Sequence, residues 1–369
     1  MTDQPTAGTE APLLHGRASD LTRRWLNLLG PLLGLALIFG IFTFLVPGGR
    51  FATYGNIESM LRQSAAVIVA ALGMTFVIIA GGIDLSIASI VALSSVITAR
   101  VLLWGATDIR GSTDFIAAHP FWIPTLAAAA GILCGMLCGL LNGALITGLR
   151  VAPFIITLGM MMVFRGAAKR FAGQRGQINP GDSWLHSVMA PVDQPYSWLL
   201  FPPGVWLVLL LALAMAVILN YSRFGRHVIA VGSNEQTARL CGISVSWTKI
   251  RVYMIGGLFG GLSGLLLFCR SNQGNATAVM GMELDVIAAV VIGGASLSGG
   301  RGSILGTVAG ALIINVIASG CSFVPIPKPL QPWLDNSTVG LPSDMQEVLT
   351  GLIIIAAVAL DRLRQHHRD

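Results

Sequence analysis

The chain has 369 residues, of which 54% are hydrophobic and only 11% are charged. A soluble domain carries about 25% charged residues because water must wet its surface, so this composition excludes an ordinary soluble globular protein. The formal net charge of +6 comes from basic residues that lie between apolar segments. Such a distribution is typical of membrane topology signals and argues against nucleic acid as a partner.

The polar segment 1–25 predicts a disordered, cytoplasmic N-terminal tail. The apolar run at 26–46 is too long for the core of a signal peptide, and no small-x-small cleavage site follows it. We therefore expect an uncleaved first membrane span, which opens a transmembrane domain of residues 26–361. Residues 362–369 form the expected cytoplasmic C-terminal tail.

Further apolar runs follow along the chain, and most are long enough to cross a hydrocarbon core about 30 Å thick. They lie at 60–80, 84–103, 123–145, 153–171, 205–219, 252–268, 284–297, 304–323 and 348–360. The sequence thus predicts an all-α polytopic membrane protein with about ten transmembrane helices. The run at 284–297 is short, and we expect it to be bent or re-entrant.

Basic residues indicate the orientation of these spans, because cytoplasmic loops carry an excess of Lys and Arg. Arg23 and Arg24 precede the first span, and Arg150 follows the fourth. The segment 220–251 and the C-terminal tail are also basic, whereas the long segment 173–203 contains acidic residues and prolines. The pattern predicts that both termini are cytoplasmic.

Glycines recur with a spacing of four in several spans, which places them on one face of each helix. The ladders are Gly131, Gly135, Gly139 and Gly143; Gly256, Gly260 and Gly264; and Gly302, Gly306 and Gly310. Small residues at this spacing let helix backbones approach closely in a membrane. We expect a compact bundle.

A helix break is predicted at 80–86, where the sequence Ala-Gly-Gly-Ile-Asp-Leu-Ser separates the second and third runs. Backbone that is not helical is tolerated at membrane depth only when protein buries it or when it lines a cavity. Asp84 beside such a break is a candidate functional residue. Alternatively, Asp84 caps the first turn of the following helix, and the two roles are compatible.

A second copy of the pattern GG-x-x-L-S begins at Gly293 and Gly294, in the other half of the chain. Interrupted hydrophobic segments in both halves are typical of the central pathway of a transporter. Our topology places both breaks towards the cytoplasm, which does not fit a simple inverted repeat. A chance match in a chain with 44 glycines therefore stays open as an alternative.

The cytoplasmic segment 220–251 predicts a short helix. Asn234 is a good N-cap, Glu235 suits a first helical turn, and Gly242 suits a C-terminal stop. A simple polar connection needs no such helix, so we interpret it as a docking site for a partner. Its residues are Asn234, Glu235, Thr237, Ala238, Arg239, Leu240, Gly242 and Ile243.

Several catalytic motifs are missing from the sequence. None of the lysines follows a glycine, so no GxxxxGK[ST] phosphate-binding loop is present, and neither HExxH nor GxSxG occurs. We expect no catalytic residues, no cofactor and no metal site. Energy for active transport would come from an ion gradient or from another subunit.

Several stretches resemble, in chain order, the permease subunits of bacterial ABC importers for simple sugars, the ribose-type branch of the branched-chain amino-acid and sugar permease superfamily. The matching stretches are 73–78 with 81–86, 141–143, 153–159 with 165–166, 234–243, and 287–294 with 298–300. The sequence departs from the family at Ala88, where glycine is common. This departure bears on how sharply the third helix starts.

The resemblance implies a subunit of the bacterial inner membrane that imports a pentose or hexose. It also implies a two-cassette ATPase on the cytoplasmic side, a periplasmic sugar-binding protein, and a second permease copy or a homologous permease. Membrane lipid is the remaining expected partner. The helix at 234–243 would be the coupling helix that contacts the ATPase. Candidate pathway residues are Gly81, Gly82, Asp84, Ser86, Asn142, Phe154, Thr157, Gly293, Gly294 and Asn315.

Other readings of the same residues stay open. Asn142, Thr157 and Asn315 could each form an interhelical hydrogen bond instead of facing a solute. The cargo could be an amino acid or a nucleoside. An ion-coupled secondary transporter would need titrating carboxylates within the membrane, for which Asp84, Glu283 and Asp285 are the candidates.

Overall fold

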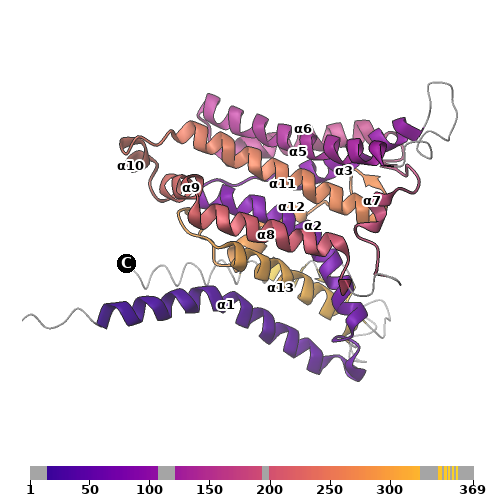
Figure 1. Ribbon diagram of the computed structural model, residues 1–369, viewed down its shortest axis with the longest axis horizontal. Helices are drawn as coiled ribbons and strands as arrows, with labels where there is room; N and C mark the ends of the chain where they lie inside the picture. The colour runs from indigo at the N-terminus through magenta and orange to yellow at the C-terminus, as the bar shows by residue number, and fades with distance from the viewer. Residues whose placement is uncertain are drawn as a thin grey trace, which may run out of the picture.

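The computed structural model describes residues 15–106, 121–192, 199–324 and 340–342, and a few positions from 345 to 355. Within these residues the protein is a bundle of α-helices (Figure 1). Its β-structure there is one antiparallel pair of two-residue strands, β1 (Gln177–Ile178) and β2 (Gly274–Asn275). The expected all-α class is confirmed.

Most of the long helices match the apolar runs of the sequence. They are α1 (His15–Leu45), α2 (Tyr54–Ile79), α3 (Ile87–Ala106), α5 (Trp122–Leu149), α6 (Pro153–Ala172), α8 (Pro203–Tyr221), α11 (Val245–Ser271) and α13 (Ile304–Phe323). Shorter elements are η1 (Pro47–Gly49), α7 (Trp184–Ser187), α9 (Arg223–Ser233), α10 (Glu235–Leu240) and α12 (Met282–Ile292).

Among the described residues, six helices are long and apolar enough to cross a membrane: α2, α3, α5, α8, α11 and α13. The expected count of about ten spans is therefore not confirmed. The apolar part of α1 is the shorter segment Gly30–Leu45, and α6 ends in a basic turn with Lys169 and Arg170. Most of the predicted span at 348–360 lies outside the described residues.

Helix α12 has only 11 residues, which gives a length of about 16 Å at 1.5 Å per residue. This is about half the thickness of a hydrocarbon core. The eighth apolar run therefore contains a helix shorter than a full span, and its re-entrant course stays a prediction. The apolar sequence continues to Leu297, but Gly293 and Gly294 end the helix first.

The long helices lie side by side, with α9 and α10 at one end of the bundle and α7 at the opposite end (Figure 1). Helix α2 forms the centre, packing against α8, α11, α12 and α13, and its residues Leu72 and Phe76 are fully buried. Large apolar side chains are exposed around the bundle, among them Leu126 of α5 and Leu213 of α8. An apolar exterior over a packed interior is the arrangement expected of a multi-pass membrane protein.

The glycine ladders mark close helix contacts, as predicted. A Cβ atom added to Gly139 of α5 would lie 2.8 Å from the Cα atom of Gly257 in α11, and one added to Gly261 would lie 2.9 Å from the Cα atom of Ile132. Real Cβ atoms do not approach backbone so closely, so glycine is required for this contact. The predicted ladder on α11 faces other helices, since Gly260 packs against Ile90 of α3.

Candidate functional site

The break after α2 is a Schellman cap. The backbone N–H of Gly82 donates to the carbonyl of Val77 at 2.9 Å, and that of Gly81 donates to the carbonyl of Ile78 at 2.9 Å. Gly81 has a φ of +79°, a conformation that glycine adopts without a steric penalty. The predicted break is confirmed, and its hydrogen bonds satisfy carbonyls at the end of the helix.

The break after α12 has the same geometry, shifted by one residue relative to the sequence match. Here the N–H of Gly294 donates to Val291 at 2.8 Å, and the N–H of Ala295 donates to Val290 at 3.1 Å. The left-handed residue is Gly294, with a φ of +89°. Gly81, the first glycine of its motif, thus corresponds to Gly294, the second glycine of its motif. The two GG-x-x-L-S motifs form the same type of cap, but their residues are not equivalent position by position.

Asp84 folds the break into a compact turn. Its Oδ1 atom accepts hydrogen bonds from the backbone N–H of Ser86 at 2.8 Å and from the Ser86 hydroxyl at 2.6 Å. This is an Asx turn, and it precedes α3, which begins at Ile87. The alternative of Asp84 as the cap of the first turn of α3 is therefore wrong, because its carboxylate binds the N–H that lies before the helix.

Two further candidates reach the same break from other helices. Asn142 of α5 donates through Nδ2 to Ser86 Oγ at 2.8 Å and to Asp84 Oδ2 at 3.4 Å. Thr157 of α6 donates through Oγ1 to the carbonyl of Ile83 at 3.3 Å. These side chains are all buried. The structure thus brings Asp84, Ser86, Asn142 and Thr157 together, and we call these four residues the break cluster.

Tyr253 of α11 also lies beside the break, and the sequence analysis missed it. A Cβ atom on Gly82 would collide with its hydroxyl group. In the described part of the chain, neither the Tyr253 hydroxyl nor Asn142 Oδ1 has a hydrogen-bond partner, although both are buried. Buried polar atoms without a hydrogen-bond partner are uncommon in folded proteins. The available signal was that Tyr253 is the one tyrosine in the largely apolar run 252–268.

The remaining pathway candidates lie elsewhere. Asn315 of α13 donates through Nδ2 to the carbonyl of Met60 at 2.6 Å and to Ser64 Oγ, so it links α13 to α2. Met60 is about 28 Å along α2 from Ile79, at 1.5 Å per residue. Phe154 is half exposed in the first turn of α6, and Gly293 packs against Gly306 of α13. The structure therefore does not gather all candidates into one site.

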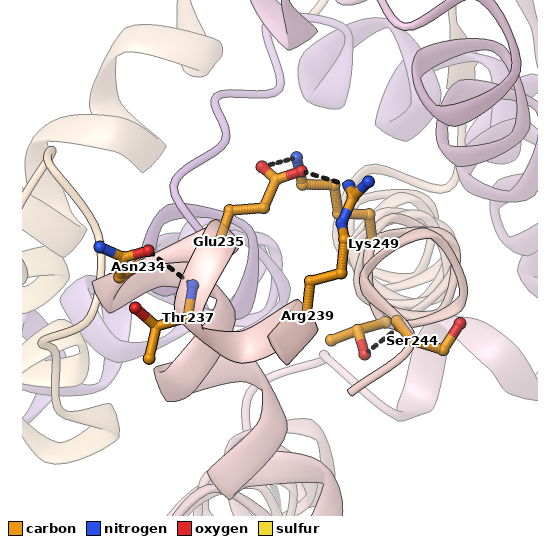
Figure 2. Close-up of polar contacts among 7 residues, drawn as sticks. Asn234, Glu235, Thr237, Arg239, Ser244 and Lys249 are labelled. Carbon is orange, nitrogen blue, oxygen red and sulfur yellow. Dashed lines mark hydrogen bonds and ion pairs between the residues drawn. The ribbon is translucent and has the colours of Figure 1, made fainter. Parts of the chain in front are cut away.

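The expected short helix between the sixth and seventh apolar runs is confirmed as α10 (Figure 2). Asn234 Oδ1 accepts a hydrogen bond from the N–H of Thr237 at 2.8 Å, which is an N-cap contact. At the other end, the N–H of Ile243 donates to Ala238 at 3.0 Å, and Gly242 has a φ of +80°. Gly242 is the stop that the sequence predicts, in a third Schellman cap.

Contacts on two sides hold α10 in place. Glu235 forms ion pairs with Lys249 at 2.7 Å and with Arg239 at 3.3 Å, as Figure 2 shows. Ala238 is buried against Val231 of α9 and Val245 of α11. The outer surface of α10 remains open.

Two large apolar side chains are exposed at this end of the bundle. Leu240 at the end of α10 is 88% exposed, and Trp247 in the first turn of α11 is 62% exposed. An anchored helix beside exposed Leu and Trp side chains is a surface suited to protein–protein contact.

One of the three carboxylates named for the ion-coupled alternative forms an ion pair. Glu283, in the first turn of α12, lies 3.7 Å from the guanidinium of Arg165 in α6, and both side chains are largely buried. The contact joins the half-length helix α12 to α6.

A bundle of apolar helices with an apolar exterior and two capped helix breaks defines the class of this protein as a multi-pass membrane protein. The chain belongs to the family described as branched-chain amino acid transport system / permease component, whose model matches residues 56–358.

Relatives of known role match nearly the whole chain. It is 37% identical to the ribose import permease protein RbsC of Bacillus subtilis (strain 168), over 90% of this chain and 92% of the relative. It is 32% identical to the L-arabinose transport system permease protein AraH of Escherichia coli (strain K12), over 99% and 98%. It is also 32% identical to the D-allose transport system permease protein AlsC of the same organism, over 89% and 90%. No solved structure gives a significant match.

Proposed function

We propose that this chain is the membrane-spanning permease subunit of an ATP-driven importer that moves a simple sugar, a pentose or a hexose, into the cytoplasm. The observation that carries the proposal is the similarity, over about nine-tenths or more of both chains, to permeases named for ribose, L-arabinose and D-allose import. The sequence contains no phosphate-binding loop, so ATP is hydrolysed on a separate two-cassette ATPase.

Helix α10 is the proposed coupling helix, lying on the cytoplasmic side against the ATPase. Its hydrophobic face is anchored through Ala238, and the ion pair of Glu235 with Lys249 fixes it to α11. Exposed Leu240 provides an apolar contact for the partner. An anchored element of this kind transmits movement of a docked subunit into the bundle.

The similarity to sugar-import permeases supports the remaining partners of the proposed assembly. A periplasmic sugar-binding protein delivers the sugar at the opposite end, where α7 lies, and a second permease copy or a homologous permease completes the pathway. The permease domain spans residues 26–361 of an inner-membrane protein, with about ten spans and both terminal tails cytoplasmic. The break cluster lies beside the pathway, with Gly81, Gly82 and the second break at Gly293 and Gly294.

The test is uptake into right-side-out proteoliposomes that contain the chain with a purified two-cassette ATPase from the same organism, ATP inside and a purified sugar-binding protein from that organism outside. Radiolabelled ribose, L-arabinose, D-allose, glucose and leucine are compared. We expect accumulation of one or more sugars that requires ATP. Uptake that persists when the ATPase carries a substitution of its phosphate-binding lysine would overturn the proposal.

A branched-chain amino acid is the second candidate cargo, because the matching family model is named for that transport system. The leucine arm of the same experiment distinguishes the two. Accumulation of leucine without accumulation of any sugar would establish the second candidate and exclude the first.

A further inference from the structure

Three segments that are far apart in the sequence meet at the end of α2 nearest to α10. The N–H of Gly300 donates to the carbonyl of Ile79, the last residue of α2, at 2.8 Å. Gly232 of α9 lies against both, because a Cβ atom added to Gly232 would be 2.7 Å from the Gly300 nitrogen and 2.8 Å from the Ile79 carbonyl carbon. Ile79, Gly232 and Gly300 thus touch through backbone atoms.

Gly299 belongs to the same backbone contact. A Cβ atom added there would be 2.7 Å from the carbonyl oxygen of Gly232 and 3.1 Å from the Cα atom of Gly81. Gly299 has a φ of +87° and Gly300 a φ of +76°, which other residues rarely adopt. We call Ile79, Gly232, Gly299 and Gly300 the glycine junction.

The glycine junction lies between the docking helix and both helix breaks. Gly232 is two residues before Asn234, the N-cap of α10. Ile79 leads directly into Gly81 and the break cluster, while Gly299 and Gly300 follow the break at Gly293 and Gly294. The segment that leads into the junction forms a turn, in which the N–H of Gly299 donates to the carbonyl of Ser296 at 3.0 Å.

A second contact fixes α9 to α2. The ring of Phe224, in the first turn of α9, stacks on the ring of Phe76 in α2, with centroids 5.9 Å apart and planes inclined by 14°. Phe76 is fully buried. Helix α9 is therefore held to α2 near both of its ends, at Phe224 and at Gly232, and α10 cannot shift far without moving the end of α2.

We propose that Gly232, Gly299 and Gly300 are positioning residues that carry movement of α10, by backbone contact, to the ends of α2 and α12, and so change both helix breaks when the docked ATPase closes. Close-packed backbone transmits displacement because no side-chain rotamer can absorb it. This inference rests on the proposed function, which supplies the subunit that moves α10.

One test uses Gly232→Ala with Gly148→Ala as the matched control. Gly148 lies near the end of α5, where α5 runs beside the start of α11, and a Cβ atom there meets nothing within 4 Å. In assembled complexes we expect Gly232→Ala to lower the sugar imported per ATP hydrolysed by at least about fivefold, the lower range of allosteric coupling, and Gly148→Ala to leave it unchanged. An unchanged ratio in assembled Gly232→Ala complexes would overturn the inference.

A second test needs no substitution, so it stands even if Gly232→Ala fails to fold. Hydrogen–deuterium exchange is measured on the wild-type complex with and without a non-hydrolysable ATP analogue. We expect exchange to change together in peptides covering 229–243, 77–86 and 293–302. A change confined to 229–243 would refute the junction while leaving the docking of α10 intact. No change in 229–243 would refute the proposed coupling role of α10, and the junction with it.

Discussion

Lys249 Nζ lies 2.7 Å from Glu235 Oε2, so one ion pair joins the start of α10 to the start of α11. Arg239 is the other partner of the same carboxylate, at 3.3 Å, but its side chain is 69% exposed whereas that of Lys249 is 22% exposed. The pair with Lys249 therefore fixes the helix to the bundle, and the pair with Arg239 lies within the helix. This difference gives a matched pair of variants.

Reversal of charge at Glu235 should impair transport without impairing folding. In Glu235→Lys the contact with Lys249 becomes repulsive, so α10 loses its ion pair to α11 and keeps only the apolar packing of Ala238 against Val245. An exposed ion pair contributes about 0–1 kcal/mol to stability, so the thermal unfolding midpoint in detergent should change little. ATP-dependent uptake should fall by at least about fivefold.

Arg239→Gln is the control for this variant, because it removes only the exposed pair, and it should transport normally. The double variant Glu235→Lys with Lys249→Glu restores opposite charges and should recover uptake. If Glu235→Lys alone transports at the wild-type rate, the anchoring role of this pair is wrong.

Gly242 should tolerate only residues that adopt a positive φ. Gly242→Asn should keep uptake, because asparagine enters the left-handed region at small cost, whereas Gly242→Val should lose it. Gly242→Pro should be the most damaging, since proline fixes φ near about −65° where the structure requires +80°. All three should insert into the membrane in equal amounts, measured by immunoblot of membrane fractions.

The break cluster should matter for both stability and transport. Asn142→Leu leaves the buried Ser86 hydroxyl and Asp84 Oδ2 without this donor, and a buried group left unsatisfied costs about 1–3 kcal/mol. We expect a lower unfolding midpoint in detergent and reduced uptake. Asp84→Ala should behave similarly, and Asp84→Asn should be milder because its amide oxygen can still accept from Ser86. Normal uptake by Asp84→Ala would reduce Asp84 to a replaceable turn residue.

Adding one methyl group at the interface between α5 and α11 should destabilise the protein. In Gly139→Ala the new Cβ atom would lie 2.8 Å from Gly257 Cα, and overpacking of this kind costs about 1–3 kcal/mol. Gly166→Ala in α6 is the control, since its Cβ atom would meet nothing within 4 Å. It should be neutral or stabilising by up to about 1 kcal/mol. Equal unfolding midpoints for the two variants would contradict the packing account.

Uptake by an ion-coupled transporter would require an ion gradient, whereas uptake by the proposed importer requires ATP. Because Glu283 is paired with Arg165 across α12 and α6, we expect it to act as a structural contact. Glu283→Gln should destabilise the protein by about 1–3 kcal/mol and leave uptake insensitive to ionophores while ATP is maintained. Collapse of wild-type uptake by an ionophore at constant ATP would favour coupling to protons or sodium.

Features encoded within a few residues were predictable from the sequence. The cap of α10 by Asn234, its stop at Gly242 and the break at Gly81 each depend on hydrogen bonds that span five residues or fewer. Local rules of helix capping therefore suffice for them. The register of the second break was not predictable, because Gly293 and Gly294 both suit the left-handed position and only the folded chain selects Gly294.

The sequence by itself determined the membrane class, the helical composition, the two breaks and the short helix α10, because apolar run length, charge and capping residues act locally or through composition. Only the tertiary structure decided which polar residues meet. Asn142 reaches Ser86 across 56 residues of chain, whereas Asn315 binds α2 instead. The physical reason is that helix packing fixes the rotation of each helix, and a one-residue change rotates a side chain by about 100°. The glycine junction likewise exists only because α2, α9 and the segment after α12 pack backbone against backbone.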